Sequence, residues 1–96
     1  MNIQEATKVI SEYMGVIKPY AESLDALVPV WKKLKSNDVW INKLENRDWN
    51  RLFFYCHKPQ EKYSPFDPFN FVEESGNNIY EVCCIATAKA IKELVK

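Results

Sequence analysis

Residues 76–96 carry the clearest structural signal of this chain, and they read GNNIYEVCCIATAKAIKELVK. Apolar side chains recur in this segment at spacings of three and four residues, which places them on one stripe of an α-helix. The stripe consists of Ile79, Val82, Cys83, Ala86, Ala90 and Leu94. Its small central residues allow a close approach to a partner, so we expect this helix to lie on a flat β-sheet. Asn78, followed by Glu81, resembles a capping box and predicts where the helix begins.

Two further helices are expected in the first third of the chain. The first spans residues 3–14, because Asn2 can cap its start and Gly15 can provide a left-handed stop. The second is capped by Ser23 and reaches to about Lys35, with one apolar stripe and lysines outside it. Pro29 lies beyond the first turn of that helix, where its missing N–H predicts a kink or an irregular opening turn.

The middle of the chain changes to the alternating pattern that is typical of β-strands. Strands are predicted at residues 39–44, 51–57 and 69–74, with a polar loop at 45–50 and a long ordered loop at 58–68. In the second strand, apolar residues occupy both faces, which indicates a central strand covered by helices on both sides. One face holds Leu52, Phe54 and Cys56, and the other holds Phe53, Tyr55 and His57. The predicted fold is one α+β domain over residues 1–96, a three-layer α/β/α sandwich with a small, mainly antiparallel sheet and the order ααβββα.

Length and charge set further limits. With 96 residues, 47% of them hydrophobic and 27% charged, the chain is expected to form one globular domain with a modest core. Thirteen basic residues balance thirteen acidic ones, and the balance holds in both halves, so no overall field favours nucleic acid or an anionic membrane. We find no signal-peptide pattern, and no apolar stretch approaches the length of a membrane span.

Catalysis and metal binding are not expected. The three cysteines, Cys56, Cys83 and Cys84, are an odd number, which argues against a disulfide framework and fits a reducing cytosol. Alternation along a strand turns His57 away from Cys56, so the sequence predicts neither a metal site nor an activated thiol. No cofactor is expected either, because the two glycines of the chain do not form a phosphate-cradling loop.

Three helical segments carry a resemblance to a known family, and they are residues 6–15 (ATKVISEYMG), 23–34 (SLDALVPVWKKL) and 85–91 (IATAKAI). They resemble the phage ABA sandwich domain family, which consists of small phage-encoded proteins. The resemblance fades between residues 39 and 72. It implies an α/β/α sandwich encoded by a bacteriophage or prophage and acting in the cytoplasm of the infected bacterial host. It supplies no catalytic residues.

A set of aromatic and basic side chains forms the candidate site for a ligand or a partner. Its members occupy predicted strand ends and loops, and they are Trp40, Arg47, Trp49, Arg51, Tyr63 and Phe66. Trp49 stands between Arg47 and Arg51, and such a combination can stack a nucleotide base and neutralise a phosphate. The same residue types are typical of a protein-binding hot spot. A third interpretation is that these rings complete the core of a small domain.

These features lead to competing hypotheses about function. The first is a non-enzymatic phage accessory protein that binds a host protein, for instance to inhibit an anti-phage defence component. The alternative is a sponge that sequesters a nucleotide immune signal, with Arg47 or Arg51 holding phosphate and Trp49 or Tyr63 stacking on the base. A structural or assembly protein of the phage is a further alternative. Ile85 lies among charged residues on the outer side of the last helix, either as a homo-oligomer contact or as a single exposed side chain.

Overall fold

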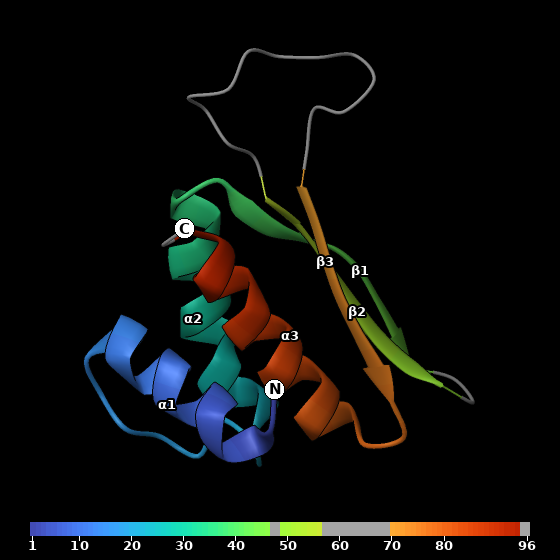
Figure 1. Ribbon diagram of the computed structural model, residues 1–96, viewed down its shortest axis with the longest axis horizontal. Coiled ribbons are helices and arrows are strands. Elements are labelled where there is room, and N and C mark those ends of the chain that lie inside the picture. The colour runs from blue at the N-terminus through green and yellow to red at the C-terminus, as the bar shows by residue number, and fades with distance from the viewer. Residues whose placement is uncertain (47–48, 57–69, 95–96) are drawn as a thin grey trace.

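The computed structural model of the chain describes residues 1–46, 49–56 and 70–94 (Figure 1). The elements are α1 (Ile3–Met14), α2 (Leu24–Ser36), β1 (Val39–Asn46), β2 (Asn50–Cys56), β3 (Asn70–Gly76) and α3 (Ile79–Leu94). The three strands pair antiparallel in the order β1-β2-β3. The predicted α+β class, the order ααβββα and the small antiparallel sheet are therefore confirmed.

Local hydrogen bonds fix the ends of α1 where the sequence predicts them. The Oδ1 of Asn2 accepts a hydrogen bond from the backbone N–H of Glu5 at 2.8 Å. Gly15 follows the last turn with a φ of 73°, and its N–H donates to the carbonyl of Ser11 at 2.8 Å. A residue with a Cβ adopts this left-handed conformation only with strain, so glycine is the suitable stop at this position.

Helix α2 is continuous across Pro29, where the sequence predicted a kink or an irregular opening turn. Ser23 caps its start, since the Oγ accepts from the N–H of Ala26 at 3.3 Å. After α2 the chain turns sharply, because Asp38 adopts a left-handed φ of 63° immediately before β1 begins. This short turn places β1 directly beside α2.

The register of the sheet places β2 between its two neighbours along its whole length. Val39 pairs with Cys56 at one end of the β1–β2 ladder, and Asn46 pairs with Asn50 at the other, with a register shift between Ile41 and Lys43. β3 continues the sheet on the opposite side of β2. The central position predicted for the second strand is confirmed.

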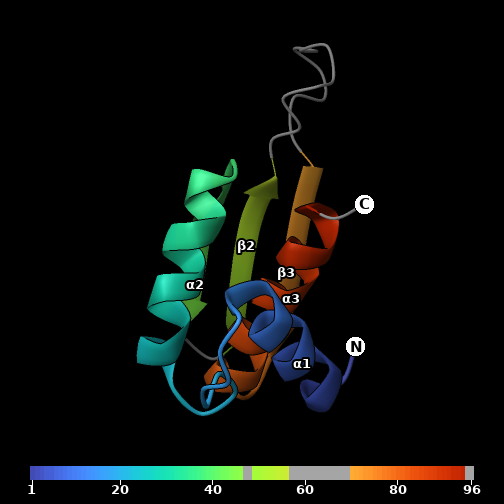
Figure 2. The same ribbon diagram turned by 90° about the vertical axis from the view of Figure 1, so that its left-hand side faces the viewer.

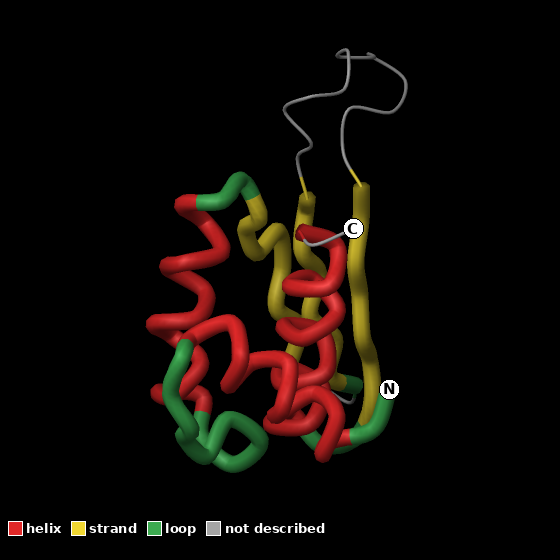
Figure 3. The backbone as a smooth tube through the Cα atoms, turned by 60° about the vertical axis from the view of Figure 1, so that its left-hand side comes forward, coloured by secondary structure: helices red, strands yellow, loops and turns green. Residues whose placement is uncertain are grey.

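The arrangement of the layers differs from the predicted sandwich. Helix α3 packs on β2 and β3, α2 packs on β1, and α1 packs on α3. All three helices lie on one side of the sheet (Figures 1 and 2), and Figure 3 shows the same grouping from an intermediate direction. The described elements therefore form a sheet, a layer of α2 and α3, and an outer layer of α1, without a helix on the second face.

The outer layer, α1, covers α3 because α3 is apolar around most of its circumference. The positions that are buried in α3 are Val82, Cys83, Cys84, Ala86, Thr87, Ala88, Ala90 and Ile91. Polar contacts show which element lies on each side: the Nζ of Lys89 reaches Glu74 on β3, and the Nζ of Lys92 lies 3.9 Å from Glu5 on α1. A helix with small apolar residues all round is stabilised by burial on both sides, which explains why α1 packs here.

The largest fully buried side chains are Tyr20, Phe54, Ile10, Leu27, Leu34 and Leu52. Tyr20 satisfies its hydroxyl inside this core by donating to the carbonyl of Val16 at 2.8 Å. Among the described residues, no helix combines the length and the apolar content that crossing a bilayer requires.

Candidate functional site

The candidate residues that the structure describes, Trp40, Trp49 and Arg51, do not form one cluster. Trp49 directly precedes β2 at one end of the sheet, whereas Trp40 lies near the opposite end of β1, in register with Tyr55. Tyr55 and Arg51 are four positions apart on β2, which corresponds to about 13 Å along the strand. The remaining three candidates, Arg47, Tyr63 and Phe66, lie outside the described residues.

Trp49 is the most exposed aromatic side chain of the candidate set that the structure describes. Its side chain is 49% exposed at the hairpin end of the sheet, which we define as Asn46, Trp49 and Asn50. Asn50 anchors this end, since it is buried and its Nδ2 donates to the carbonyl of Asn77 at 2.9 Å. The bond joins the hairpin end to the connection between β3 and α3. Trp49 therefore directly precedes a residue that is anchored to the β3–α3 connection.

Beside Trp49, the sheet presents a face that no described helix covers (Figure 1). Leu52, Phe54 and Val72 are buried beneath the helices. Four of the intervening positions bear charged side chains, and we call these four the open face: Lys43, Glu45, Arg51 and Glu73. Their charges are paired, with 3.0 Å between Lys43 Nζ and Glu45 Oε1 and 3.8 Å between Arg51 Nε and Glu73 Oε2.

The second predicted tryptophan, Trp40, belongs to a different feature. It lines a hollow of about 320 Å³ between α2 and β1, here called the α2–β1 hollow. The residues that line it are Val28, Trp31, Lys32, Lys35, Trp40 and Ile41. The sequence pattern assigns Trp31 to the packing stripe of its helix and the lysines to solvent, so it does not predict that they surround one space. The available signal is the spacing of Trp31, Lys32 and Lys35, which places them on adjacent parts of one helical face.

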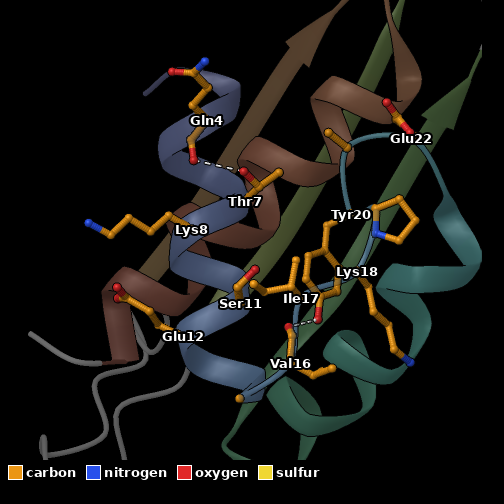
Figure 4. Close-up of a pocket in the computed structure, with 13 residues that line it drawn as sticks. Gln4, Thr7, Lys8, Ser11, Glu12, Val16, Ile17, Lys18, Tyr20 and Glu22 are labelled. Atoms are coloured by element: carbon orange, nitrogen blue, oxygen red, sulfur yellow. Dashed lines mark hydrogen bonds between the residues drawn. The ribbon is translucent and has the colours of Figure 1, made fainter.

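A groove of larger volume runs along α1. It has a volume of about 740 Å³ and lies between the outer side of α1 and the segment 15–22 (Figure 4). In this view Ser11 and Ile17 lie between the helix and the segment, while Lys8 and Glu12 extend away from it. Ile17 is 87% exposed, although it is a large aliphatic residue. The sequence pattern identifies this segment only as a connector.

The described cysteines are unsuited to nucleophilic chemistry. Cys83 and Cys84 are free and fully buried. Burial raises the pKa of the Cys83 thiol to about 11, and burial together with the neighbouring Cys83 raises the pKa of the Cys84 thiol to about 11, so both are protonated at neutral pH. Within residues 1–46, 49–56 and 70–94, no group of three or more His, Cys, Asp and Glu side chains could hold a metal ion. His57 and the side chain of Cys56 lie outside the described part of the chain.

For Ile85 on the outer side of α3, the sequence leaves two interpretations, a homo-oligomer contact or a single exposed side chain. This residue is partly buried and packs against the core cluster, so it is not the isolated exposed side chain of the second interpretation. The question of a homo-oligomer stays a prediction.

Comparisons of the chain with protein-family models, with curated proteins and with solved structures find no match. The resemblance to the phage ABA sandwich domain family therefore stays a prediction from the sequence. The nucleotide site built from Arg47 or Arg51 with Trp49 or Tyr63 also stays a prediction, since two of its members lie outside the described residues.

Proposed function

We propose that this chain is a small phage-encoded accessory protein that acts by binding a host protein through the hairpin end and the open face of its sheet. The observation that carries the proposal is Trp49, a half-exposed indole on a backbone that Asn50 holds in place. A rigid aromatic side chain loses little conformational entropy when a partner covers it. Tryptophan and arginine are also the residue types most enriched in binding hot spots.

The area of Trp49 gives the scale of its contribution. An indole that is 49% exposed presents about 100 Å² to solvent, and burying this area at about 25 cal/mol per Å² contributes about 2–3 kcal/mol. Truncation to alanine is therefore expected to weaken binding by about 30- to 150-fold.

The paired charges of the open face serve a different purpose from the indole. Lys43 with Glu45 and Arg51 with Glu73 leave this face nearly neutral while they still offer donors and acceptors to a partner. Exposed pairs of this kind contribute little to stability. At an interface they set the orientation of the partner and exclude partners of mismatched charge.

The biological setting rests on the resemblance of the helical segments to phage proteins. It favours action in the cytoplasm of the infected bacterium, on a component of anti-phage defence. An accessory protein of this kind needs only to occupy the surface of its target, which fits a small domain with one fixed aromatic anchor.

Affinity capture from a lysate of infected host cells tests the proposal. The tagged wild-type protein is compared with Trp49→Ala and with Ile17→Ala, which removes an equally prominent apolar side chain from the segment 15–22. We expect a host protein that is retained by wild type and Ile17→Ala and lost with Trp49→Ala, and calorimetry with the purified partner should give the 30- to 150-fold difference estimated above.

Folding is checked by urea denaturation, in which both variants should lie within about 0.5 kcal/mol of wild type because both positions are exposed. Equal retention by wild type and Trp49→Ala would refute the hairpin end as the binding surface. Retention lost only with Ile17→Ala would assign the function to the groove along α1 instead.

A further inference from the structure

The α2–β1 hollow combines two features that small-molecule sites need, which are tryptophans in its lining and cations that form no ion pair with a described residue. We propose that it binds a small aromatic anion, with a planar ring beside Trp31 and Trp40 and a phosphate beside Lys32 and Lys35. A purine mononucleotide is a ligand of this chemistry. The site is independent of the hairpin end, because Trp40 lies near the opposite end of the sheet.

The indole of Trp31 is held in place before any ligand arrives. Its Nε1–H donates to the Oγ1 of Thr87 on α3 at 2.9 Å, and this hydroxyl donates in turn to the carbonyl of Cys83 at 2.6 Å. Thr87 is fully buried, so water does not compete for these bonds. The polar end of the indole is therefore satisfied in the core while its ring forms part of the wall of the hollow.

Trp40 completes the wall from the other side. It belongs to β1, whereas Trp31 belongs to α2, so the two residues line the hollow from different elements. Val28 and Ile41 supply the remaining apolar surface. Aromatic side chains of this kind stack on a nucleobase through its π-face and tolerate any base.

The cations are available because no described residue neutralises them. Lys32 and Lys35 lie three positions apart on α2, so they are neighbours on the helix surface. Neither forms an ion pair with a described residue, and the six residues that line the hollow include no carboxylate.

Lys33, in the same turn of α2, differs from Lys32 and Lys35 because its ammonium group has partners. Its Nζ donates to the carbonyl of Tyr13 at 2.6 Å and lies 4.2 Å from the centre of the Tyr13 ring, so this lysine is occupied in joining α2 to α1.

The dimensions limit the ligand. A volume of about 320 Å³ lies at the lower end of the roughly 300–1,000 Å³ that is typical of ligand sites, which fits one mononucleotide rather than a dinucleotide. The lysines are exposed, so their attraction for phosphate is screened by salt. Binding should therefore be strongest at low ionic strength and weaken steadily as salt is added.

Calorimetry at low salt with adenosine 5′-monophosphate, adenosine and inorganic phosphate as separate probes tests both halves of the site. We expect the mononucleotide to bind about tenfold or more tightly than either fragment, because it engages the rings and the lysines together. In proton–nitrogen spectra, the indole N–H signals of Trp31 and Trp40 should shift on titration while that of Trp49 stays in place.

Two double variants that each remove two positive charges distinguish binding at the hollow from attraction by the overall charge of the protein. Lys32→Ala with Lys35→Ala should weaken binding of the mononucleotide about tenfold. Lys8→Ala with Lys18→Ala removes the same charge from the groove along α1 and should leave binding unchanged. Urea denaturation verifies that both variants fold.

Three results would overturn the proposal: no saturable binding of the mononucleotide, equal loss in the two double variants, or a shift of the Trp49 indole in place of the other two. Inorganic phosphate that binds as tightly as the mononucleotide would also overturn it, since the rings would then contribute nothing.

Discussion

Replacing a small buried residue by a larger one on each of two opposite sides of α3 tests whether α1 packs on the outer side of this helix. This packing is observed, whereas the predicted sandwich has helices on both faces of the sheet. Ala86 and Ala88 are both fully buried. Two positions along an α-helix correspond to a rotation of about 200°, so these side chains point in nearly opposite directions. Lys89 marks the side of α3 that faces β3, and Lys92 marks the side that faces α1. Ala86 lies toward the sheet on this helical geometry, and Ala88 lies toward the outer helical layer.

The expected magnitudes come from overpacking. Replacing either alanine by leucine forces extra methylene groups into a filled interior, which costs about 1–3 kcal/mol. Leucine is nearly as good a helix former as alanine, so propensity adds little. For a domain of this size each variant should lower the melting temperature by about 4–24 °C. Glu81→Leu on the same helix is the control, because Glu81 is exposed and its loss should cost less than about 1 kcal/mol.

Urea denaturation followed by circular dichroism measures all three variants under one condition. The structure predicts that Ala86→Leu and Ala88→Leu both destabilise the protein and that Glu81→Leu does not. If α3 had a free outer side, Ala88→Leu would match the control. The packing of α1 on α3 would therefore be refuted if Ala86→Leu destabilised the protein while Ala88→Leu kept the unfolding free energy of wild type.

Three further predictions concern single contacts. Thr87→Val should lower the free energy of unfolding by about 1–2 kcal/mol because the indole N–H of Trp31 loses its acceptor. Thr87→Ser retains the hydroxyl acceptor and should stay near wild type. Equal urea curves for Thr87→Val and wild type would contradict this prediction. Gly15→Ala should cost about 1–2 kcal/mol through its φ of 73° rather than a clash, since no atom lies within 4 Å of the added Cβ, and Gly15→Asn should cost less in the same assay. Burial raises the pKa of Cys83 and Cys84 to about 11, so the stability that the two thiols contribute is present below pH 9 and is lost as pH rises toward 11. Urea midpoints measured between pH 9 and pH 11 should therefore fall more steeply for wild type than for the double variant Cys83→Ala with Cys84→Ala.

Local signals predicted the helices and strands well because each depends on neighbouring residues. Asn2 and Gly15 define α1 through hydrogen bonds within a few positions of themselves, and both ends of the helix are as predicted. The strands are less sharply bounded. β1 continues to Asn46 rather than ending at residue 44, because Glu45 and Asn46 pair with Arg51 and Asn50 across the hairpin. The polar character of these residues suggested a loop, but backbone pairing does not require apolar side chains.

The side of the sheet on which each helix packs depends on contacts between distant elements. Apolar residues on both faces of the central strand led to the prediction of helices on both sides. The competing signal was the run from Val82 to Ala88, which is apolar or small without interruption apart from a threonine. A single stripe accounts for only part of this run, and Cys84, Ala88 and Ile91 supply a second apolar side on which α1 packs. Weighing the whole circumference of the helix would have favoured the observed layers.

The structure describes three of the six candidate site residues, Trp40, Trp49 and Arg51, and their use as a site stays a prediction. The exposure of Trp49 follows from its place in a polar hairpin, and it is observed. Its separation from Trp40 follows from antiparallel pairing, which places the two ends of β1 far apart. The hollow beside Trp40 was not predicted because it requires the position of α2 relative to β1, which no periodicity in the sequence encodes.

The contact between α1 and α3 joins the first and the last helix of the described chain, with the whole sheet between them in sequence. During synthesis on the ribosome, α1 emerges long before the surface that buries Ala6 and Ile10 exists. Closing so long a loop is slow compared with forming a local helix pair. Nascent chains should therefore stay susceptible to proteases until α3 has been translated, and then become resistant in a single cooperative step.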